Sequence, residues 1–374
     1  MIYLDYSATT PVDEDILSSF NQTCLKYPGN TNSLHKLGVE AKKLENSATK
    51  QIADILNVKE NEIIYTSGSS ESNNTALKGI AFKYQNRGKH IITTNLEHSS
   101  IYAPLGYLQK LGFKVDFVKT NEFGQVDLED LKSLITDETI LVTIASVNSE
   151  TGMLQPISEI ANILKEHKCF FHVDATQSIG KVKMDFSNVD LLSFSAHKFF
   201  GLKGIGCLIK KENVSIEPLI HGGKSTTIFR SGTPALPLIV SLSKALRLIY
   251  QDIDKCYEHV KYLNNYITDN LKKYNNIFIN SNEYCIPHII NLSIVGIKPE
   301  TMLHALEEED IYISTQSACS SNNPISKAVL EITKDEEKAK YSIRISISKK
   351  TTKEEIDIFL KTFERCYQNL TLKN

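Results

Sequence analysis

Apolar residues follow two alternating patterns along this chain. Between about residues 62 and 210, short runs rich in β-branched residues alternate with longer stretches in which apolar residues recur at helical spacing. The runs predict strands at Glu62–Ser67, His90–Asn95, Lys114–Thr120, Thr139–Val147, Phe170–Thr176 and Leu191–Ser195. Stretches such as Ser70–Asn86 and Pro156–Lys168 predict helices. The alternation predicts an α/β fold with a mostly parallel, doubly wound sheet, whose ligands bind at the carboxyl ends of the strands.

A second, smaller α+β unit is predicted after this region. The long amphipathic stretch Pro237–Tyr274 leads out of the large domain. The elements expected beyond it are strands at Pro287–Ser293 and Ser342–Ser348, a helix at Pro299–Glu309 and a final helix from Lys353. We therefore expect a large domain at residues 15–250, and a small domain formed by residues 1–14 and 251–374.

The composition narrows the class of protein. The 374 residues include 42 basic and 44 acidic side chains and give a net charge of -2, with no long block of one sign. We therefore expect neither a nucleic-acid nor an anionic membrane surface. The seven cysteines are scattered without a CxxC pair, which argues against a disulfide framework or a zinc site and favours a reducing compartment. With neither a leader pattern nor a membrane-spanning apolar run, we expect a cytoplasmic protein.

Two of the predicted strands end in residues that carry chemistry. The run Phe171–Ser178 places Asp174 at a strand end, where an Asp either caps a turn or pairs with the pyridinium nitrogen of an electron-sink cofactor. Lys198 follows the next strand, beside Phe199 and Phe200. An isolated lysine is usually a solvated surface group, but burial beside aromatic side chains lowers its pKa and favours amine chemistry. Together, the two motifs favour the cofactor interpretation of both residues.

Three further segments carry polar groups of interest. Thr66–Asn74 supplies a strand, a glycine turn, hydroxyls and a helix, which either cap the helix or hold a phosphate at its N-terminus. His98 lies at another strand-to-helix junction, where it is a cap or buried contact, or else stacks on a cofactor and moves protons. Arg344 alternates with isoleucines, so it lies on an exposed edge face or serves as a planar fork for a substrate carboxylate.

Cys319 is the cysteine whose surroundings favour reactivity. It stands in Gln316–Pro324, a segment of small and polar residues, whereas a free cysteine is more often packed in an apolar core. Access and a polar setting are what a nucleophilic thiolate needs. The other six cysteines lack such a sequence context, so Cys319 is the candidate nucleophile.

Taken together, these segments resemble the cysteine desulfurases of the NifS/IscS type, within the class V aminotransferase group of the fold-type I pyridoxal-phosphate enzymes. The resemblance spans nearly the whole chain. The matching segments are Leu4–Pro11, Ser67–Asn74, Glu97–His98, Asp174–Ser178, Ser195–Lys198, His221–Gly223, Arg230–Thr233, Ser317–Cys319 and Ser342–Arg344. Any one of these could match by chance, but the ordered set is specific.

The resemblance implies a pyridoxal 5′-phosphate cofactor and assigns residues to it. Lys198 would hold the cofactor as a Schiff base. Asp174 would pair with its ring nitrogen and Gln177 with its ring hydroxyl. His98 would stack on the ring and transfer protons. The phosphate would be held by Ser69, Ser70, Ser195 and His197.

The resemblance also implies a substrate and partners. L-Cysteine would bind through its carboxylate to Arg344, helped by Asn30, and its sulfur would pass to Cys319 as a persulfide, leaving L-alanine. Thr233 would reach the cofactor phosphate of the neighbouring subunit, which implies a homodimer. An acceptor protein in iron–sulfur cluster assembly, or in tRNA or cofactor thiolation, would then take the sulfur.

The chain departs from the family pattern beside this site. Ser149 stands where the family has an Asn that contacts the cofactor ring, which leaves that contact to Asn148 or to water. The altered segment at residues 224–226 lacks an acidic side chain that the family carries. These departures leave open a non-catalytic sulfur-transfer subunit. Two enzyme alternatives also stay open: a selenocysteine lyase, which could dispense with the thiol, and a generic class V aminotransferase, which should not need Cys319.

Overall fold

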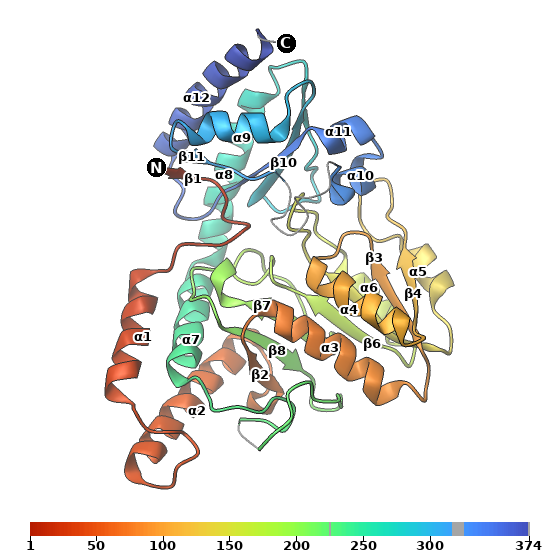
Figure 1. The fold of residues 1–374 in the computed structure, drawn as a ribbon, viewed down its shortest axis with the longest axis vertical. Coiled ribbons are helices and arrows are strands. Elements are labelled where there is room, and N and C mark those ends of the chain that lie inside the picture. Colours follow the sequence, from red (N-terminus) through yellow and green to blue (C-terminus); the bar gives the residue numbers. More distant parts are fainter. Residues whose placement is uncertain (224–225, 316–324, 373–374) are drawn as a thin grey trace.

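The computed structural model describes residues 1–223, 226–315 and 325–372. Figure 1 shows a larger part built on one sheet and a smaller part at the end of the molecule that holds both termini. The larger part contains a seven-stranded sheet, and the smaller part contains a three-stranded sheet and a two-stranded pair. Within the described ranges, every helix is too short or too polar to cross a membrane.

The seven-stranded sheet has the predicted architecture. In spatial order its strands are β2 (Ile63–Thr66), β8 (Gly206–Lys210), β7 (Leu191–Ser195), β6 (Phe170–Asp174), β5 (Thr139–Ala145), β3 (His90–Thr94) and β4 (Lys114–Val118). β8 is antiparallel to both of its neighbours, and the other pairs are parallel. The mostly parallel α/β fold is thus confirmed. The sequence pattern missed β8, because this short strand begins at a glycine within a glycine-containing turn region.

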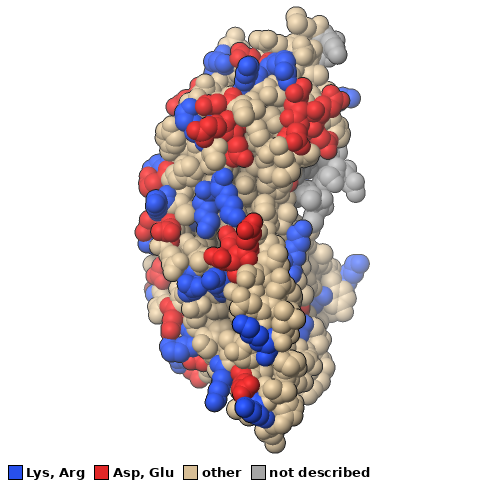
Figure 2. Space-filling model, turned by 90° about the vertical axis from the view of Figure 1, so that its left-hand side faces the viewer, with Lys and Arg blue, Asp and Glu red and all other residues tan. Residues whose placement is uncertain are grey.

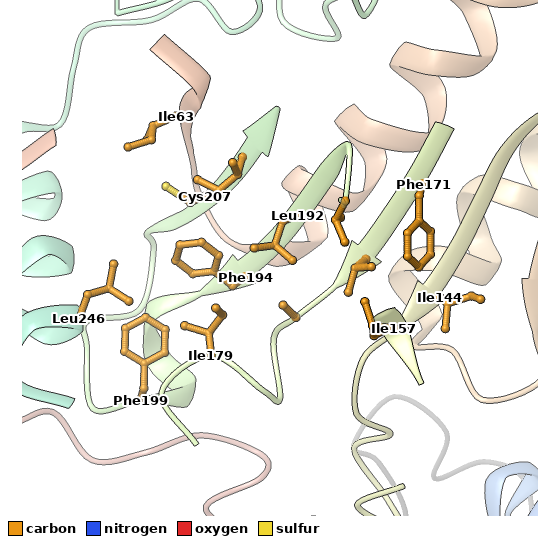
Figure 3. Packing of buried hydrophobic residues seen from close by; sticks show 14 of the residues in the cluster. Ile63, Ile144, Ile157, Phe171, Ile179, Leu192, Phe194, Phe199, Cys207 and Leu246 are labelled. Carbon is orange, nitrogen blue, oxygen red and sulfur yellow. The ribbon is translucent and has the colours of Figure 1, made fainter. Parts of the chain in front are cut away.

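Helices cover both faces of this sheet. Neighbouring residues in a strand point to opposite faces, so Ile64 packs into one core cluster and Ile63 into the other. The face that carries Ile64 is covered by α3 (Ser69–Tyr84) and α4 (Ser99–Lys110). The face that carries Ile63, called the second face below, is covered by α2 (Lys36–Leu56), α6 (Ile157–Leu164) and α7 (Leu236–Gln251). Figure 3 shows side chains of the second face, where Phe194 and Leu246 lie in one packed layer. Burial on both faces explains why these strands read as continuous apolar runs.

The smaller part has its own core. β10 (Ile289–Ile294) lies between β12 (Ser342–Ser346) and β9 (Ile277–Ile279) and is antiparallel to both, and β1 (Ile2–Tyr3) pairs in parallel with β11 (Ile311–Tyr312). Its helices are α8 (Ile253–Leu271), α9 (Pro299–Glu307), α10 (Lys327–Thr333), α11 (Glu336–Lys340) and α12 (Lys353–Thr371). The long amphipathic stretch divides into α7 and α8 at Asp252. A separate apolar cluster supports the expected domain division, whose boundaries stay a prediction.

The remaining short elements complete the larger part. They are α1 (Glu14–Lys26), α5 (Leu128–Leu134) and the 3₁₀ turns η1 (Glu60–Glu62) and η2 (Ala196–Lys198). On the molecular face drawn in Figure 2, basic and acidic side chains lie intermixed. That face therefore presents no broad field of one sign.

Residues 4–10 form an N-terminal strap between the two parts, with a turn closed by Ala8 N–H donating to Asp5 O at 3.0 Å. Leu4 is fully buried in the core of the smaller part, where its N–H donates to Tyr312 O and its carbonyl accepts from Ser346 N. Tyr6 already belongs to the core of the larger part. At the far end, Thr10 N–H donates to His197 O at 2.9 Å. The strap thus joins the two cores over a few residues.

Replacing the buried anchor of the strap is expected to destabilise the protein. Leu4→Ala leaves a cavity in the core of the smaller part, and we expect the free energy of unfolding to fall by about 2–5 kcal/mol. Denaturant unfolding of the cofactor-free protein measures it. The matched control is Leu25→Ala, at a side chain that is 84% exposed, which should change stability by less than about 0.5 kcal/mol. Equal effects of the two substitutions would contradict the anchoring role of Leu4.

Candidate active site

A cavity of about 240 Å³ opens at the carboxyl edge of the large sheet. Segments that follow β2, β3, β5, β6 and β7 all contribute to its wall, together with the N-terminal strap and β12 of the smaller part. The lining residues are Ser7, Ala8, Ser69, Ser70, Leu96, His98, Ala145, Val147, Ser149, Asp174, Thr176, Gln177, His197, Lys198 and Arg344. The strand ends of a doubly wound sheet are where such folds bind ligands.

Eight of the predicted site residues line this one cavity. They are Ser69, Ser70, His98, Asp174, Gln177, His197, Lys198 and Arg344. Ser195 is buried directly beneath, and its Oγ lies 3.3 Å from the position that a Cβ on Gly68 would take. The sequence separations among these residues are large, so their convergence comes from the fold.

The Lys198 amine is held by the N-terminal strap. Lys198 follows β7 in the turn η2, and its Nζ donates to Ser7 O at 2.6 Å and to Ala8 O at 2.7 Å. Neighbouring His197 contacts Thr9 Oγ1 through Nδ1 at 3.1 Å. Burial and the charge of Lys198 lower the pKa of His197 to about 4, so its imidazole is neutral. The strap therefore fixes the position of the amine.

A cradle for an anion lies where β2 leads into α3. The N-cap of α3 is Gly68, which has no side chain to bond the first turn, so these N–H groups stay available for an anion. Ser69 and Ser70 add hydroxyls at the cavity wall. The cradle is closely built, because a Cβ on Gly206 would lie 2.7 Å from Gly68 Cα. Only glycine at residue 206 permits that approach.

A hydrogen-bond chain connects Asp174 to His98. Asn73 Nδ2 donates to Asp174 Oδ2 and to Ser100 Oγ, both at 2.8 Å. Asp174 Oδ1 accepts from Thr176 N–H at 3.0 Å. Ser100 Oγ accepts from Asn73, so its own hydroxyl proton can be donated to His98 Nδ1, 2.8 Å away. Asn73 therefore orients both ends of the chain.

The same contacts define the protonation state of His98. The Ser100 backbone N–H also donates to His98 Nδ1, at 3.1 Å, so Nδ1 carries no proton and the ring proton lies on Nε2. Burial lowers the pKa of His98, against the opposing influence of Asp174. His98 is thus neutral near pH 7. It can donate the proton on Nε2, and it can also take up a proton to become an imidazolium.

Arg344 is buried instead of lying on an exposed edge. Its side chain is 2% exposed, and Nη2 binds Asp5 Oδ1 at 2.8 Å while Nη1 donates to Ser149 O at 2.9 Å. Its buried Nε has no hydrogen-bond acceptor among the described residues. The guanidinium plane is therefore fixed and keeps a donor for a ligand. Because Arg344 binds the backbone of Ser149, the unusual side chain at that position leaves this contact intact.

Besides Ser195, four predicted site residues do not line the described cavity. The side chain of Asn148 donates to Leu96 O, in the loop after β3, and accepts from Glu150 N and Thr151 N in its own loop. Asn30 is exposed in the loop between α1 and α2, where its Oδ1 accepts from Asn32 N. The other two are Thr233, which lines a separate hollow with Ser67 and Arg230, and Cys319, which lies outside the described residues. The roles of these four stay predictions.

The residues present fit pyridoxal phosphate. The uncapped N-terminus of α3 suits a phosphate, the Asp174 carboxylate suits a protonated ring nitrogen, and the Lys198 amine suits a Schiff base. Thr176 Oγ1 also lines the cavity and is buried without a hydrogen-bond partner among the described residues. Within those residues, no group of acidic, histidine and cysteine side chains could hold a metal ion.

Sequence reasoning missed the contribution of the strap and of Asn73. Asp5, Ser7 and Thr9 contact Arg344, Gln177 and His197 respectively, in hydrogen bonds that cross most of the chain. Both segments belong to the matching family motifs, but no role was predicted for the strap or for Asn73. The available signal was the cluster of small polar residues after the apolar Leu4.

Comparisons with known proteins agree with this geometry. The family model described as aminotransferase class-V matches residues 2–359. A "NifS/IcsS protein homolog" of Lactobacillus delbrueckii subsp. bulgaricus is 40% identical, over 100% of this chain and 99% of the relative. "Cysteine desulfurase IscS" of Dictyoglomus turgidum is 38% identical, over 99% of this chain and 95% of the relative.

Solved structures give the same result. A structure titled "NIFS-LIKE PROTEIN" superposes with a TM-score of 0.93 at 34% identity, covering 99% of both chains. "SspA in complex with cysteine" superposes with a TM-score of 0.83 at 32% identity, covering 94% of this chain and 100% of the other.

A buried histidine beneath the site should make stability depend on pH. His172 of β6 bonds Thr143 and Ser193, and burial lowers its pKa to about 4. Between pH 6.5 and about 4 the unfolded chain therefore binds a proton at this residue that the folded chain does not, so stability falls as the pH falls through this window. Removing the imidazole removes that dependence.

We expect the stability advantage of the wild type over His172→Gln to narrow as the pH falls below 6.5, by about 1.4 kcal/mol for each pH unit. Denaturant unfolding of both proteins at a series of pH values between 7 and about 4 measures the difference. A difference that stays constant across the series would show that His172 titrates alike in the folded and unfolded chains.

Proposed function

This chain belongs to the class-V aminotransferase family and is a pyridoxal-phosphate-dependent cysteine desulfurase, and we propose that Lys198, Cys319 and Arg344 carry its reaction. L-Cysteine is converted to L-alanine, and its sulfur is left on Cys319 as a persulfide. The observation that carries the proposal is the convergence of Lys198, His98 and Asp174, each at the end of a different strand, on one cavity that Arg344 also lines.

The cofactor, when bound, withdraws electrons from the substrate Cα and so makes its proton acidic. Asp174 holds the proton on the ring nitrogen, since its carboxylate is fixed by Asn73 and by Thr176 N–H. The α3 N-terminus holds the phosphate, with Ser69 and Ser70. Gln177 reaches the same cavity with its amide.

Arg344 binds and orients the substrate carboxylate. A planar guanidinium presents several N–H donors in a rigid fork, which suits a carboxylate. Asp5 and Ser149 O hold two of its nitrogens, so little conformational freedom remains to be lost on binding. Asn30 is proposed to help this contact, although its side chain is exposed in the α1–α2 loop.

Lys198 and His98 move protons around the substrate. The Lys198 amine takes the Cα proton as general base, from a position set by the carbonyls of Ser7 and Ala8. Because Nδ1 of neutral His98 is already bonded to Ser100, proton transfer takes place at Nε2, which can give its proton and take one back. Asn148 is proposed to replace the family's ring-contacting amide, although its side chain is bonded to Leu96 O and to Glu150 N–H.

Cys319 takes the sulfur. Its thiolate attacks the substrate sulfur, the S–S bond forms as the C–S bond breaks, and the electron pair of the broken bond stays with the three-carbon fragment. That fragment gains a proton and leaves as L-alanine, so the overall change is L-cysteine plus thiol to L-alanine plus persulfide. The polar sequence around Cys319 supports this role.

We also propose the partners and the compartment. Thr233 lies away from its own cavity, in a hollow with Ser67 and Arg230, which supports a homodimer in which it reaches the cofactor phosphate of the second subunit. Persulfide sulfur would pass to an acceptor in iron–sulfur assembly or in tRNA or cofactor thiolation. The free cysteines among the described residues support a reducing, cytoplasmic setting.

Replacing Lys198 tests the cofactor assignment. The purified wild type should be yellow from bound cofactor, and Lys198→Ala should lose that visible absorbance because no amine remains to form the Schiff base. Alanine production should fall by roughly 10²–10⁴-fold, the range for loss of a general base. Lys203→Ala is the matched control, since Lys203 is exposed in the same segment. A colourless wild type that pyridoxal phosphate does not reconstitute would overturn the assignment.

Replacing Cys319 tests the sulfur transfer separately. Cys319→Ala should keep the cofactor absorbance but form no persulfide, so mass spectrometry after addition of L-cysteine should find no added sulfur at residue 319. Cys24→Ala, at an exposed cysteine, should behave as the wild type. Cysteine-dependent sulfide release at the full rate in Cys319→Ala would favour the lyase that dispenses with the thiol.

A further inference from the structure

Lys181 is a buried lysine that the reaction described above does not use. It is 7% exposed and lies one turn beyond Gln177, with its N–H bonded to Ser178 O. Gly180 makes the turn possible, because it adopts a φ of +75° and a Cβ there would lie 2.9 Å from Phe199 Cβ. The turn returns the Lys181 side chain to Gln177, where Nζ donates to Oε1.

The contacts of Gln177 fix which way its amide points. One end of the amide faces Ser7, at 3.0 Å from its carbonyl oxygen and 3.2 Å from its Oγ; because a carbonyl only accepts, the atom at this end is the Nε2 donor. The atom at the other end is therefore Oε1, and it accepts from Lys181 Nζ. The Ser7 carbonyl thus decides the orientation, and the Lys181 contact is consistent with it. Gln177 lines the cavity, so the orientation decides whether it offers a ligand a donor or an acceptor.

Burying the charged form of Lys181 is costly. Within the described residues its amine makes one hydrogen bond, to Gln177, and no ion pair that would offset the charge. The charged and titratable groups that face it there are Lys198, Arg344, His197 and His288. Burial and the two cations lower the pKa of Lys181 well below its ordinary value. A buried amine kept at such a cost beside a ligand cavity indicates a role in that site.

We propose that Lys181 is a positioning residue for Gln177: by holding Oε1, it keeps Nε2 directed to Ser7 and the cavity, so that Gln177 presents only a donor to the cofactor's ring oxygen. The inference rests on the proposed function and adds to it a residue that touches neither substrate nor cofactor. Without Lys181 the amide is free to flip, and the donor is lost for part of the time.

The test uses the pH dependence of the bound cofactor's visible absorbance. A fixed N–H donor and a nearby amine both favour the cofactor form that has lost a proton, so Lys181→Met should move the midpoint upward by roughly half to one pH unit. The dissociation constant of pyridoxal phosphate, titrated into the cofactor-free protein, should rise by about 2–10-fold. A purely structural lysine would leave the midpoint unchanged.

Four further variants isolate the route through Gln177. Gln177→Leu should shift the midpoint in the same direction, and adding Lys181→Met to it should give no further shift, as expected for residues that act as one unit. Lys181→Gln keeps an N–H donor and should retain the wild-type midpoint. Lys210→Met is the matched control, because Lys210 is also buried but donates to Val214 O, away from the cavity.

Thermal unfolding of each cofactor-free variant shows that it is folded, and Lys181→Leu, which also removes the N–H donor and should shift the midpoint, gives the test if Lys181→Met is not folded. An unshifted midpoint in folded Lys181→Met, or additive shifts in the double variant, would overturn the role of Lys181 while leaving the proposed function standing. A wild type without cofactor absorbance would instead overturn the proposed function, and this inference with it.

Discussion

The carbonyl oxygen of Ser7 is the acceptor around which the active site is organised. It receives Lys198 Nζ at 2.6 Å and Gln177 Nε2 at 3.0 Å, while the N–H of the same residue donates to Ser346 Oγ on β12 at 2.8 Å. One peptide segment thus sets the positions of two side chains of the larger part against a strand of the smaller part. The key acceptor is a backbone atom, and the Ser7 hydroxyl adds to it by accepting from Gln177 Nε2 at 3.2 Å and donating to Ser149 O at 2.8 Å.

The charges around the cavity are arranged for a ligand with two anionic groups. Lys198, Arg344 and Lys181 bring amine and guanidinium groups to one region, and the carboxylates of Asp174 and Asp5 are each committed to hydrogen bonds. Glu97 adds no negative charge near pH 7, because burial raises the pKa of its carboxyl to about 8 and so keeps it protonated. These groups lose much of their hydration when the protein folds, not when the ligand binds. A phosphate and a carboxylate would therefore bind to donors that are already in place and need little rearrangement.

The sequence predicted the parts of the fold that follow regular patterns. The strands carrying His98, Asp174 and Lys198 were found because both of their faces are buried, which leaves continuous apolar runs that end in polar residues. The strap was not predicted as part of the site, since a short segment held by hydrogen bonds to distant residues has no periodicity. The two bonds of Asn73 depend on where α3 lies against β6, which no local pattern contains. Thr233 and Asn30 were assigned through the family, and neither lines the cavity of this chain.

The ion pair between Asp5 and Arg344 joins residues 339 positions apart, and this separation constrains how the protein reaches its working state. During synthesis the strap is made first, yet its partners on β11 and β12 come last. The large sheet can assemble earlier from segments close in sequence, but the wall formed by Arg344 is absent until almost the whole chain has left the ribosome. An unfinished or truncated chain would therefore carry an incomplete cavity, and full cofactor capture becomes a late event that reports on completion of the chain.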